Sequence, residues 1–489
     1  MKISLPKSSD QVQQWGPVDM KLLYNSFWFA PMSGAVKSRW GIYWTEMVGI
    51  MENDTGTFFW WKNSLENEGV KSIKRWLLPD DKRKLVTDGY WELIGEIKKT
   101  AGKLERLKPK ASFADVQSLA LKWHALYYKF WSLADVFEIA NYGAPEYLKK
   151  QLSSFVPKSE LESVMEVLLA PENLSFNQLS EKELLECVLK ANPKIHLESL
   201  IKNYAAKWHW LDNSYYQSKR LPPAYFLKKI KELSRAEAKA KLSQIKKYLQ
   251  SVKQKKTAII KNFKLSVSIA KLAEILSFSI WMQDHRKGIA WWSSDVATQF
   301  SKHLAKRLGV PLEDILHYSA DEWREAFAIG KKLSDKVFNQ RKNKLYVMYS
   351  RKGFYTFLAG TEAKRIAKHF ASLKHENGNQ QTDSLSGTVV SKGSTIIKGV
   401  VRVIHSARQS NRLKRGEILV APMTSPDYIS AMRLAKAVIT DVGGLMSHAA
   451  IVSRELGIPC IVNTKIATKI LKNGDRVTIN TKSGTVIKL

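Results

Sequence analysis

Apolar residues recur at helical spacing through most of the first 375 residues. Between residues 228 and 264 they follow at intervals close to three or four residues, or multiples of these, which places them on one helix face; they are Ile230, Leu233, Leu242, Ile245, Leu249, Val252, Ile259 and Phe263. Residues 111–136 and 159–203 repeat this pattern. We therefore predict a mainly α-helical region over residues 1–375.

The first part of this region is less regular. Residues 15–61 hold aromatic clusters, among them Trp15-Gly16-Pro17 and Phe58-Phe59-Trp60-Trp61. Such clusters are compatible with short strands, since aromatic residues are enriched in β-structure. We treat residues 1–110 as a candidate subdomain.

After residue 385, strand patterns alternate with helix patterns. Buried strands are predicted at 417–421, 437–440 and 460–462, with helices at 427–435 and 447–456. Residues 387–403 suggest a β-hairpin or meander, and residues 475–487 a closing hairpin. The pattern predicts a compact α+β domain over residues 385–489.

Composition changes at the same boundary. All 16 tryptophans precede residue 385, whereas glycine is about twice as dense after it, with 9 of the 25 glycines in residues 385–489. The polar run 374–384 lacks any periodicity, which is typical of a linker. We place the linker at residues 376–384.

The chain is strongly basic. Its 78 Lys and Arg outnumber 45 Asp and Glu, giving a net charge of +33. The excess is present on both sides of the boundary, with 62 against 40 before residue 385 and 16 against 5 after it. Such charge favours an anionic partner, either nucleic acid, a phosphorylated small molecule or an acidic protein.

Other classes are excluded or disfavoured. A hydrophobic fraction of 44% excludes wholesale disorder. Cys187 and Cys460 are the only cysteines, too few for a disulfide framework or a Cys-rich zinc module. Residues 1–7 lack a signal-peptide core, and no apolar run approaches the ~18 residues of a membrane helix. We expect a soluble, cytoplasmic protein without a membrane partner.

The segment with the clearest chemistry is 440–459. A predicted strand ends, Gly443-Gly444 allow a tight turn, and a helix begins with Ser447-His448. Free N–H groups and the positive dipole end at a helix N-terminus favour a bound phosphate. A neutral imidazole there suits a histidine that accepts a phosphoryl group on a ring nitrogen and passes it on. We predict that His448 is this nucleophile.

This segment resembles the phosphohistidine, or mobile, domain of phosphoenolpyruvate-utilising enzymes. The resemblance covers about residues 385–489, and its most specific part is the string Gly-Gly-x-x-Ser-His-Ala-Ala-Ile-Val-x-Arg-Glu-x-Gly-Ile-Pro ending at Pro459. Residues 416–427, 467–468 and 471–477 also look like parts of that domain. The resemblance implies a swivelling β/β/α fold with His448 as the phosphocarrier. Dikinase-type members carry a regulatory threonine where this chain has Met446, so that control is not expected here.

The phosphoryl donor is expected on another protein. Relatives join this domain to an ATP-grasp domain and sometimes to a pyruvate-binding barrel. Residues 1–384 have too little glycine and too little strand pattern for either. The resemblance therefore implies a separate ATP-grasp or PEP-binding partner that brings Mg²⁺ with ATP or PEP. No residue spacing argues for a metal or cofactor held by this chain.

The helical region offers candidates for binding the phosphoryl acceptor, an unknown small molecule. Residues 208–213, 223–226 and 284–287 are weakly similar to the helical region of rifampin-phosphotransferase-like proteins. We name Asp284, His285 and Arg286 as candidates for that role. A solvated helix end is the structural alternative for these residues. The tryptophans at 60, 61, 291 and 292 would line a ligand pocket or, as the alternative, pack in the core.

Four residues near His448 are candidates for phosphate binding: Gly443, Gly444, Ser447 and Arg454. For Ser447 a capping role alone is the alternative. For Arg454 it is pairing with a neighbouring acid.

Two hypotheses of different classes follow. In the first, the chain is a phosphotransferase component that carries a phosphoryl group on His448 from the donor protein to an acceptor. In the second, it is a non-catalytic binding or regulatory protein whose histidine domain is a relic or a switch. Its basic segment 228–264, with 13 Lys and Arg against two Glu, would then bind nucleic acid or an acidic partner rather than serve as a solvated helix face.

Overall fold

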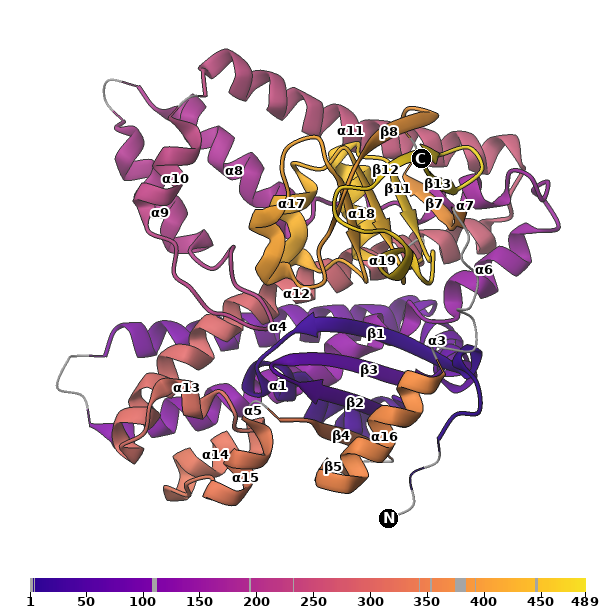
Figure 1. Cartoon of the computed structure of the whole chain (residues 1–489). Helices are drawn as coiled ribbons and strands as arrows, with labels where there is room; N and C mark the ends of the chain where they lie inside the picture. The colour runs from indigo at the N-terminus through magenta and orange to yellow at the C-terminus, as the bar shows by residue number, and fades with distance from the viewer. Residues whose placement is uncertain are drawn as a thin grey trace.

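The structure is a computed structural model of the whole chain (Figure 1). It describes residues 3, 5–107, 112–192, 195–231, 233–342, 344–351, 354–373, 384–391, 393–444 and 447–489. Residues 376–383 of the expected linker lie outside the described residues, and Ser384 begins a strand. Met446, where relatives have a regulatory threonine, also lies outside them.

Helices dominate the N-terminal region, as the periodicity predicts. Side-chain caps define several of their starts: Ser112 and Asp115 form a capping box on α5, and Ser266 accepts from the backbone N–H of Ile269 on α12. The helices are α1 (Leu22–Ser33), α2 (Ala35–Trp40), α3 (Lys62–Ser72), α4 (Asp80–Glu105), α5 (Phe113–Ala140), α6 (Ala144–Leu152), α7 (Leu161–Leu169), α8 (Phe176–Lys190), α9 (Leu197–Trp208), α10 (Pro223–Ile230), α11 (Arg235–Asn262), α12 (Val267–Leu308), α13 (Leu312–Ile315), α14 (Ala320–Ile329), α15 (Asp335–Arg341) and α16 (Gly360–Ser372).

A five-stranded antiparallel sheet joins the two ends of this region. Its order is β1-β3-β2-β4-β5. The strands are β1 (Val12–Asp19), β2 (Met47–Glu52), β3 (Thr55–Trp61), β4 (Tyr346–Arg351) and β5 (Phe354–Ala359). The first three match the aromatic stretch that is compatible with strands, whereas the sequence analysis did not predict β4 and β5. The candidate subdomain 1–110 thus shares its sheet with residues almost 300 positions later.

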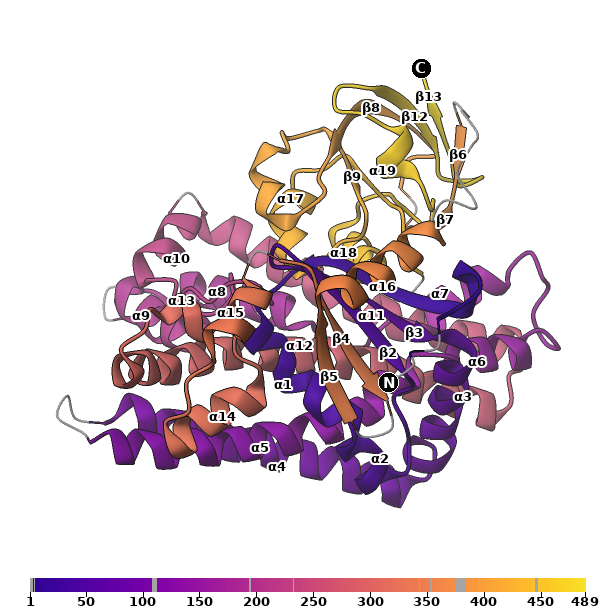
Figure 2. The same ribbon diagram turned by 60° about the horizontal axis from the view of Figure 1, so that its bottom comes forward.

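The sheet separates two hydrophobic clusters. On one face Phe59 stacks on Phe370 of α16, with ring centroids 4.2 Å apart. The other face packs on the large core built around α5 and α12 (Figures 1 and 2). Trp60 and Trp291 are buried in that core, so they pack rather than line an open pocket.

The C-terminal domain is a curved eight-stranded sheet with short helices. The order is β6-β13-β12-β8-β9-β10-β11-β7. The strands are β6 (Ser384–Ser386), β7 (Thr388–Ser391), β8 (Ile396–Val403), β9 (Ile418–Ala421), β10 (Ala437–Thr440), β11 (Cys460–Val462), β12 (Arg476–Asn480) and β13 (Thr485–Lys488); the helices are α17 (Ile429–Met432), α18 (His448–Leu456) and α19 (Ala467–Ile470). The parallel strands β8 to β11 alternate their side chains between two cores: Leu419 and Val438 pack towards α17 and α18, and Ile418 and Ile439 towards β12 and β13.

One predicted connection is wrong. Residues 387–403 were expected as a hairpin or meander, but β7 pairs with β11, and β8 pairs with β12 and β9. Only Gly387 lies between β6 and β7, yet these strands stand at opposite ends of the sheet order. The sheet therefore curls until its two edges meet. Local alternation of apolar residues cannot distinguish this long-range pairing from a hairpin.

Candidate functional site

The turn before α18 depends on glycine and serine. Gly443 has φ +139°, and a Cβ added there would lie 3.0 Å from Ser447 Oγ. Ser447 caps the helix, because its Oγ accepts a hydrogen bond from the backbone N–H of Ala450 at 3.3 Å. Its own N–H donates to the Gly444 carbonyl at 2.9 Å. This turn sets His448 at the first position of α18, after the end of β10.

The two ring nitrogens of His448 differ in their surroundings. Nδ1 lies 2.9 Å from the Thr424 hydroxyl, whereas Nε2 is buried and has no hydrogen-bond partner among the described residues. Burial, and then the charge of Lys287, hold the pKa of His448 well below its usual range. The imidazole is therefore neutral at pH 7. When Nδ1–H donates to Thr424, Nε2 carries the free lone pair of a nucleophile.

Thr424 is a site residue that sequence reasoning missed. It lies in the loop after β9 and is 2% exposed. The segment 416–427 already resembled the mobile domain, but nothing in its spacing showed that this hydroxyl would meet a histidine 24 positions later. The parallel pairing of β9 with β10 brings the two loops together.

Removing the Thr424 hydroxyl should slow phosphorylation of His448. Thr424→Val loses the contact that orients the ring and holds the Nδ1 proton, and we expect about a fivefold lower rate, in line with a hydrogen bond worth about 1 kcal/mol. The rate of label incorporation at His448 is the measurement. Thr424→Ser keeps a hydroxyl and should stay near the wild-type rate; equal rates for the serine and valine variants would contradict the role.

Lys287, a residue of the helical region, places a positive charge near His448. It lies in the middle of α12 and is partly buried. Among the described residues it makes no hydrogen bond or ion pair. Burial lowers the pKa of its ammonium, and the charges of Glu138 and Asp284 oppose this. After burial, the positive charge of Lys287 is what lowers the pKa of His448. A cation at this place is suited to a phosphoryl group in transit.

The three acceptor candidates beside Lys287 are engaged in packing. The Asp284 carboxylate accepts from the Phe176 N–H at 2.9 Å, and His285 Nδ1 lies 2.9 Å from the Tyr90 hydroxyl. Arg286 donates to Glu138 at 2.7 Å. These residues lie in the middle of a 42-residue helix, so the solvated helix end is wrong as an alternative. Their role in binding an acceptor stays a prediction.

The phosphate candidates divide between the turn and the far end of α18. Gly443 and Gly444 are exposed, and the Ser447 hydroxyl serves as the cap. Arg454 lies six positions after His448, about 9 Å along the helix axis. Its Nε is 4.0 Å from Glu166 of α7, which is the neighbouring-acid arrangement. Phosphate binding by these four residues stays a prediction.

The C-terminal domain lies on the helical region (Figure 2), and polar contacts join the two. Arg433 donates to Glu181 at 3.4 Å, and the Gly16 N–H lies 2.9 Å from the Met423 sulfur. Two carboxyl groups of the domain are buried against the helical region. Burial raises the pKa of Glu455 to about 8 and that of Asp427 to about 7. Ser175 makes a hydrogen bond with the carboxyl group of Glu455, and Ser214 makes one with that of Asp427.

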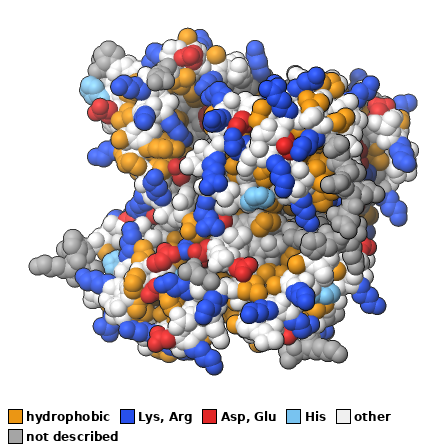
Figure 3. Space-filling model, viewed as in Figure 1, with side chains coloured by type: hydrophobic (Ala, Val, Ile, Leu, Met, Phe, Trp, Pro, Cys, Tyr) orange, Lys and Arg blue, Asp and Glu red, His pale blue; other side chains and the backbone are white. Residues whose placement is uncertain are grey.

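Two further observations concern groups and surfaces outside the site. Among the described residues, no cluster of three or more His, Cys, Asp and Glu side chains could hold a metal ion. Within the same residues, no helix combines the length and apolar character that a membrane crossing demands. The basic helix α11 turns most of its lysines to solvent, and Figure 3 shows Lys and Arg side chains spread over the visible face.

Comparisons with known proteins agree with the motif. Residues 413–484 match the family model "PEP-utilising enzyme, mobile domain". The chain is 44% identical over 117 residues to a probable phosphoenolpyruvate synthase of Archaeoglobus fulgidus, covering 23% of this chain and 16% of the relative. It is 34% identical over 207 residues to phosphoenolpyruvate synthase of Pyrococcus furiosus, covering 41% and 22%. It is 32% identical over 177 residues to an uncharacterized phosphotransferase, YvkC, of Bacillus subtilis, covering 36% and 21%.

These matches concern part of each protein. The chain covers less than a quarter of the length of these relatives. The holo-form of aconitase X of Thermococcus kodakaraensis covers 22% of this chain at 21% identity with a TM-score of 0.18, too low to support an argument. The match to the mobile domain includes His448, Thr424 and the capped turn. Residues 413–484 are therefore a mobile domain of the PEP-utilising enzymes.

Proposed function

We propose that this chain is a phosphotransferase component that carries a phosphoryl group on His448. The observation that carries the proposal is the arrangement of the imidazole. Nδ1 bonds to Thr424, Nε2 has no hydrogen-bond partner among the residues that the structure describes, and the charge of Lys287 acts on the ring. The domain match and the named phosphotransferase relatives support the same chemistry.

In the loading step the Nε2 lone pair attacks the donor phosphorus. The P–N bond forms as the P–O bond to the donor breaks, and the leaving group takes that electron pair. The Nδ1 proton stays on the ring, bonded to Thr424. In the unloading step a nucleophilic atom of the acceptor attacks phosphorus, the P–N bond breaks, and its electron pair returns to Nε2. Both steps need alignment and positive charge more than further covalent chemistry, which suits Lys287.

The donor and the acceptor belong to different sites in this proposal. A separate ATP-grasp or PEP-binding protein, with its Mg²⁺, loads His448, and the helical region binds the small-molecule acceptor. The C-terminal domain moves between them on the linker 376–384. The burial of Nε2 supports this movement, because the attacking nitrogen of the docked, half-buried His448 is covered.

A discharge experiment tests the proposal. The purified full chain is loaded with labelled phosphoramidate, a small-molecule phosphoryl donor, and then mixed with the small-molecule fraction of a cell extract. Label should leave His448 and appear in a phosphorylated small molecule. Release of label only as inorganic phosphate, at the same rate with and without the extract, would contradict transfer.

Docking should weaken as pH rises. Glu455 and Asp427 have raised pKa values of about 8 and about 7, because burial and the carboxylates of Asp284 and Asp19 disfavour their ionisation; Arg433 and Arg454 oppose this at Glu455. A raised carboxyl pKa means that the docked form binds the proton. Its contribution is complete below the undocked pKa of about 4 and is lost as pH rises through the docked values.

Energy transfer between two dyes measures this loss. One dye is placed on Cys187 and the other on a cysteine that replaces the exposed Lys482. The efficiency of energy transfer should fall between about pH 5 and about pH 8.5. For each of the two carboxyl groups, the docking equilibrium constant should decrease by at most tenfold per pH unit. Glu455→Gln should flatten the profile. A signal that does not change with pH would contradict proton-linked docking.

A further inference from the structure

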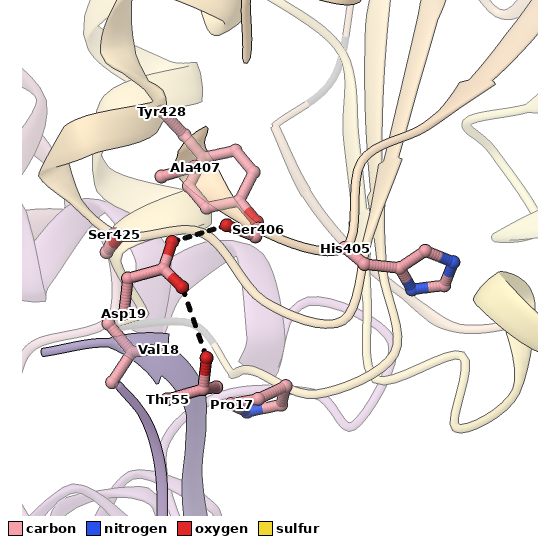
Figure 4. Close-up of a pocket in the computed structure, with 9 residues that line it drawn as sticks. All are labelled: Pro17, Val18, Asp19, Thr55, His405, Ser406, Ala407, Ser425 and Tyr428. Atoms are coloured by element: carbon pink, nitrogen blue, oxygen red, sulfur yellow. Dashed lines mark hydrogen bonds between the residues drawn. The ribbon is translucent and has the colours of Figure 1, made fainter. Parts of the chain in front are cut away.

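Asp19, the last residue of β1, connects the sheet of the helical region to the C-terminal domain. Its residue is 3% exposed. One carboxylate oxygen accepts from the Ser406 hydroxyl at 2.5 Å, and the other accepts from the Thr55 hydroxyl at 3.3 Å (Figure 4). The second oxygen also accepts from Arg408 at 2.8 Å. Two of these three partners come from the C-terminal domain. No role for Asp19 follows from the sequence, since nothing near it resembles a motif.

The surroundings of Asp19 include a neighbour of the residue that bonds to His448. Arg408 also lies over the Tyr216 ring, 4.9 Å from its centroid, so it contacts the helical region twice. Ser425 and Tyr428 of the C-terminal domain line the small cavity beside Asp19 (Figure 4). Ser425 follows Thr424, the residue whose hydroxyl bonds His448. The end of β1 therefore lines the same cavity as the loop that orients the imidazole.

The charge arrangement makes this contact strong in the docked form. A buried carboxylate that accepts three hydrogen bonds, one of them from a guanidinium, is a charge-assisted network. The Arg408 side chain is 44% exposed, so the buried member of the pair is Asp19, and loss of Arg408 leaves that carboxylate buried without its cation. The exposed ion pairs of the interface are weaker by comparison: Arg433 and Glu181 are both exposed at their side chains, and such pairs contribute little.

We propose that Asp19 is the positioning residue that holds the C-terminal domain docked with His448 against Lys287, and that breaking its contacts to Ser406 and Arg408 exposes His448 Nε2. The exposure of Nε2 has a use only if the proposed function holds, because a donor protein must reach this nitrogen to load it. Asp19 thus sets the balance between the docked, acceptor-facing arrangement and the undocked, donor-accessible one.

Chemical modification of His448 tests this without any phosphoryl chemistry. Diethyl pyrocarbonate modifies accessible imidazole nitrogens, and peptide mapping by mass spectrometry gives the rate at each histidine. In the full-length wild type, His448 should react slowly, because Nε2 is covered. In Asp19→Ala and in Arg408→Ala it should react at least tenfold faster, and the double variant should react no faster than either single one.

The controls separate anchoring from loss of structure. Asp54→Asn removes a neighbouring carboxylate that pairs with Lys21 at 2.6 Å within the helical region, and it should leave His448 protected. Asp19→Arg combined with Arg408→Asp should restore protection. Far-UV circular dichroism and the exposed His303 of α12 report whether the fold is intact, since both should match the wild type.

The outcomes are distinct. Equal modification of His448 in wild type and Asp19→Ala, with both folded, would overturn the proposal, as would equal acceleration by Asp54→Asn. If His448 proves never to take a phosphoryl group, the proposed function fails, but the modification rates still decide whether Asp19 holds the domain in place.

Discussion

A His448→Gln variant should take up no phosphoryl group at all. Glutamine has a similar length and keeps hydrogen-bonding capacity towards Thr424, but its amide nitrogen has no nucleophilic lone pair. Labelled ATP or PEP with an extract of the source cells should therefore mark the wild type and leave the variant at background, because the nucleophile itself is missing. Label retained on the intact protein after gel filtration is the measurement.

His405→Gln is the matched control for this experiment. His405 lies in the same domain but is exposed and outside the capped turn. It should label as the wild type does. Loss of label in both variants would point to a general effect on the domain, and label retained in His448→Gln would place the carrier elsewhere.

A Lys287→Met variant should transfer the phosphoryl group about a hundred- to a thousandfold more slowly. Methionine keeps most of the side-chain volume but removes the charge that stabilises the transferring group, and the loss of one such preorganised electrostatic contact costs about that much. The rate at which preloaded His448 loses its label to the small-molecule fraction is the measurement. Lys287→Arg keeps a cation and should be closer to the wild type.

The same variant gives a second readout that altered packing would not produce. The charge of Lys287 disfavours the imidazolium, so its removal should raise the pKa of His448 towards the usual range. An NMR titration of the His448 ring would show this upward shift in Lys287→Met and little change in Lys287→Arg. A slower transfer with an unchanged His448 pKa would argue that Lys287 acts through structure alone.

Local patterns predicted the C-terminal elements well, because each is short and has its own period. The strand at 437–440, the helix after Ser447 and its end at Gly457 are close to β10 and α18. Gly443 and Ser447 could be predicted because a capped helix after a tight turn has a local signature. The string around His448 added a specific resemblance that covers residues 413–484 in the family match.

Long-range features were beyond the same reasoning. The pairing of β2 with β4 joins residues almost 300 positions apart, and β7 leaves its neighbour β8 to pair with β11. Thr424 and Lys287 reach His448 only through tertiary packing, since one comes from the next loop of the sheet and the other from α12. The weak resemblance at 284–287 spans Lys287, but it gave no sign that the charge of this residue lowers the pKa of His448. Acceptor binding by Asp284, His285 and Arg286 stays a prediction.

The chemical stability of the label on His448 tests the central claim most directly. The wild-type chain, loaded by its donor, is split into samples treated with acid and with alkali, and the peptide that carries the label is then identified by mass spectrometry. A phosphoramidate at His448 predicts that the label is lost in acid, survives in alkali and lies on the peptide containing His448. Label that survives acid, or that lies on a peptide without His448, would contradict the account.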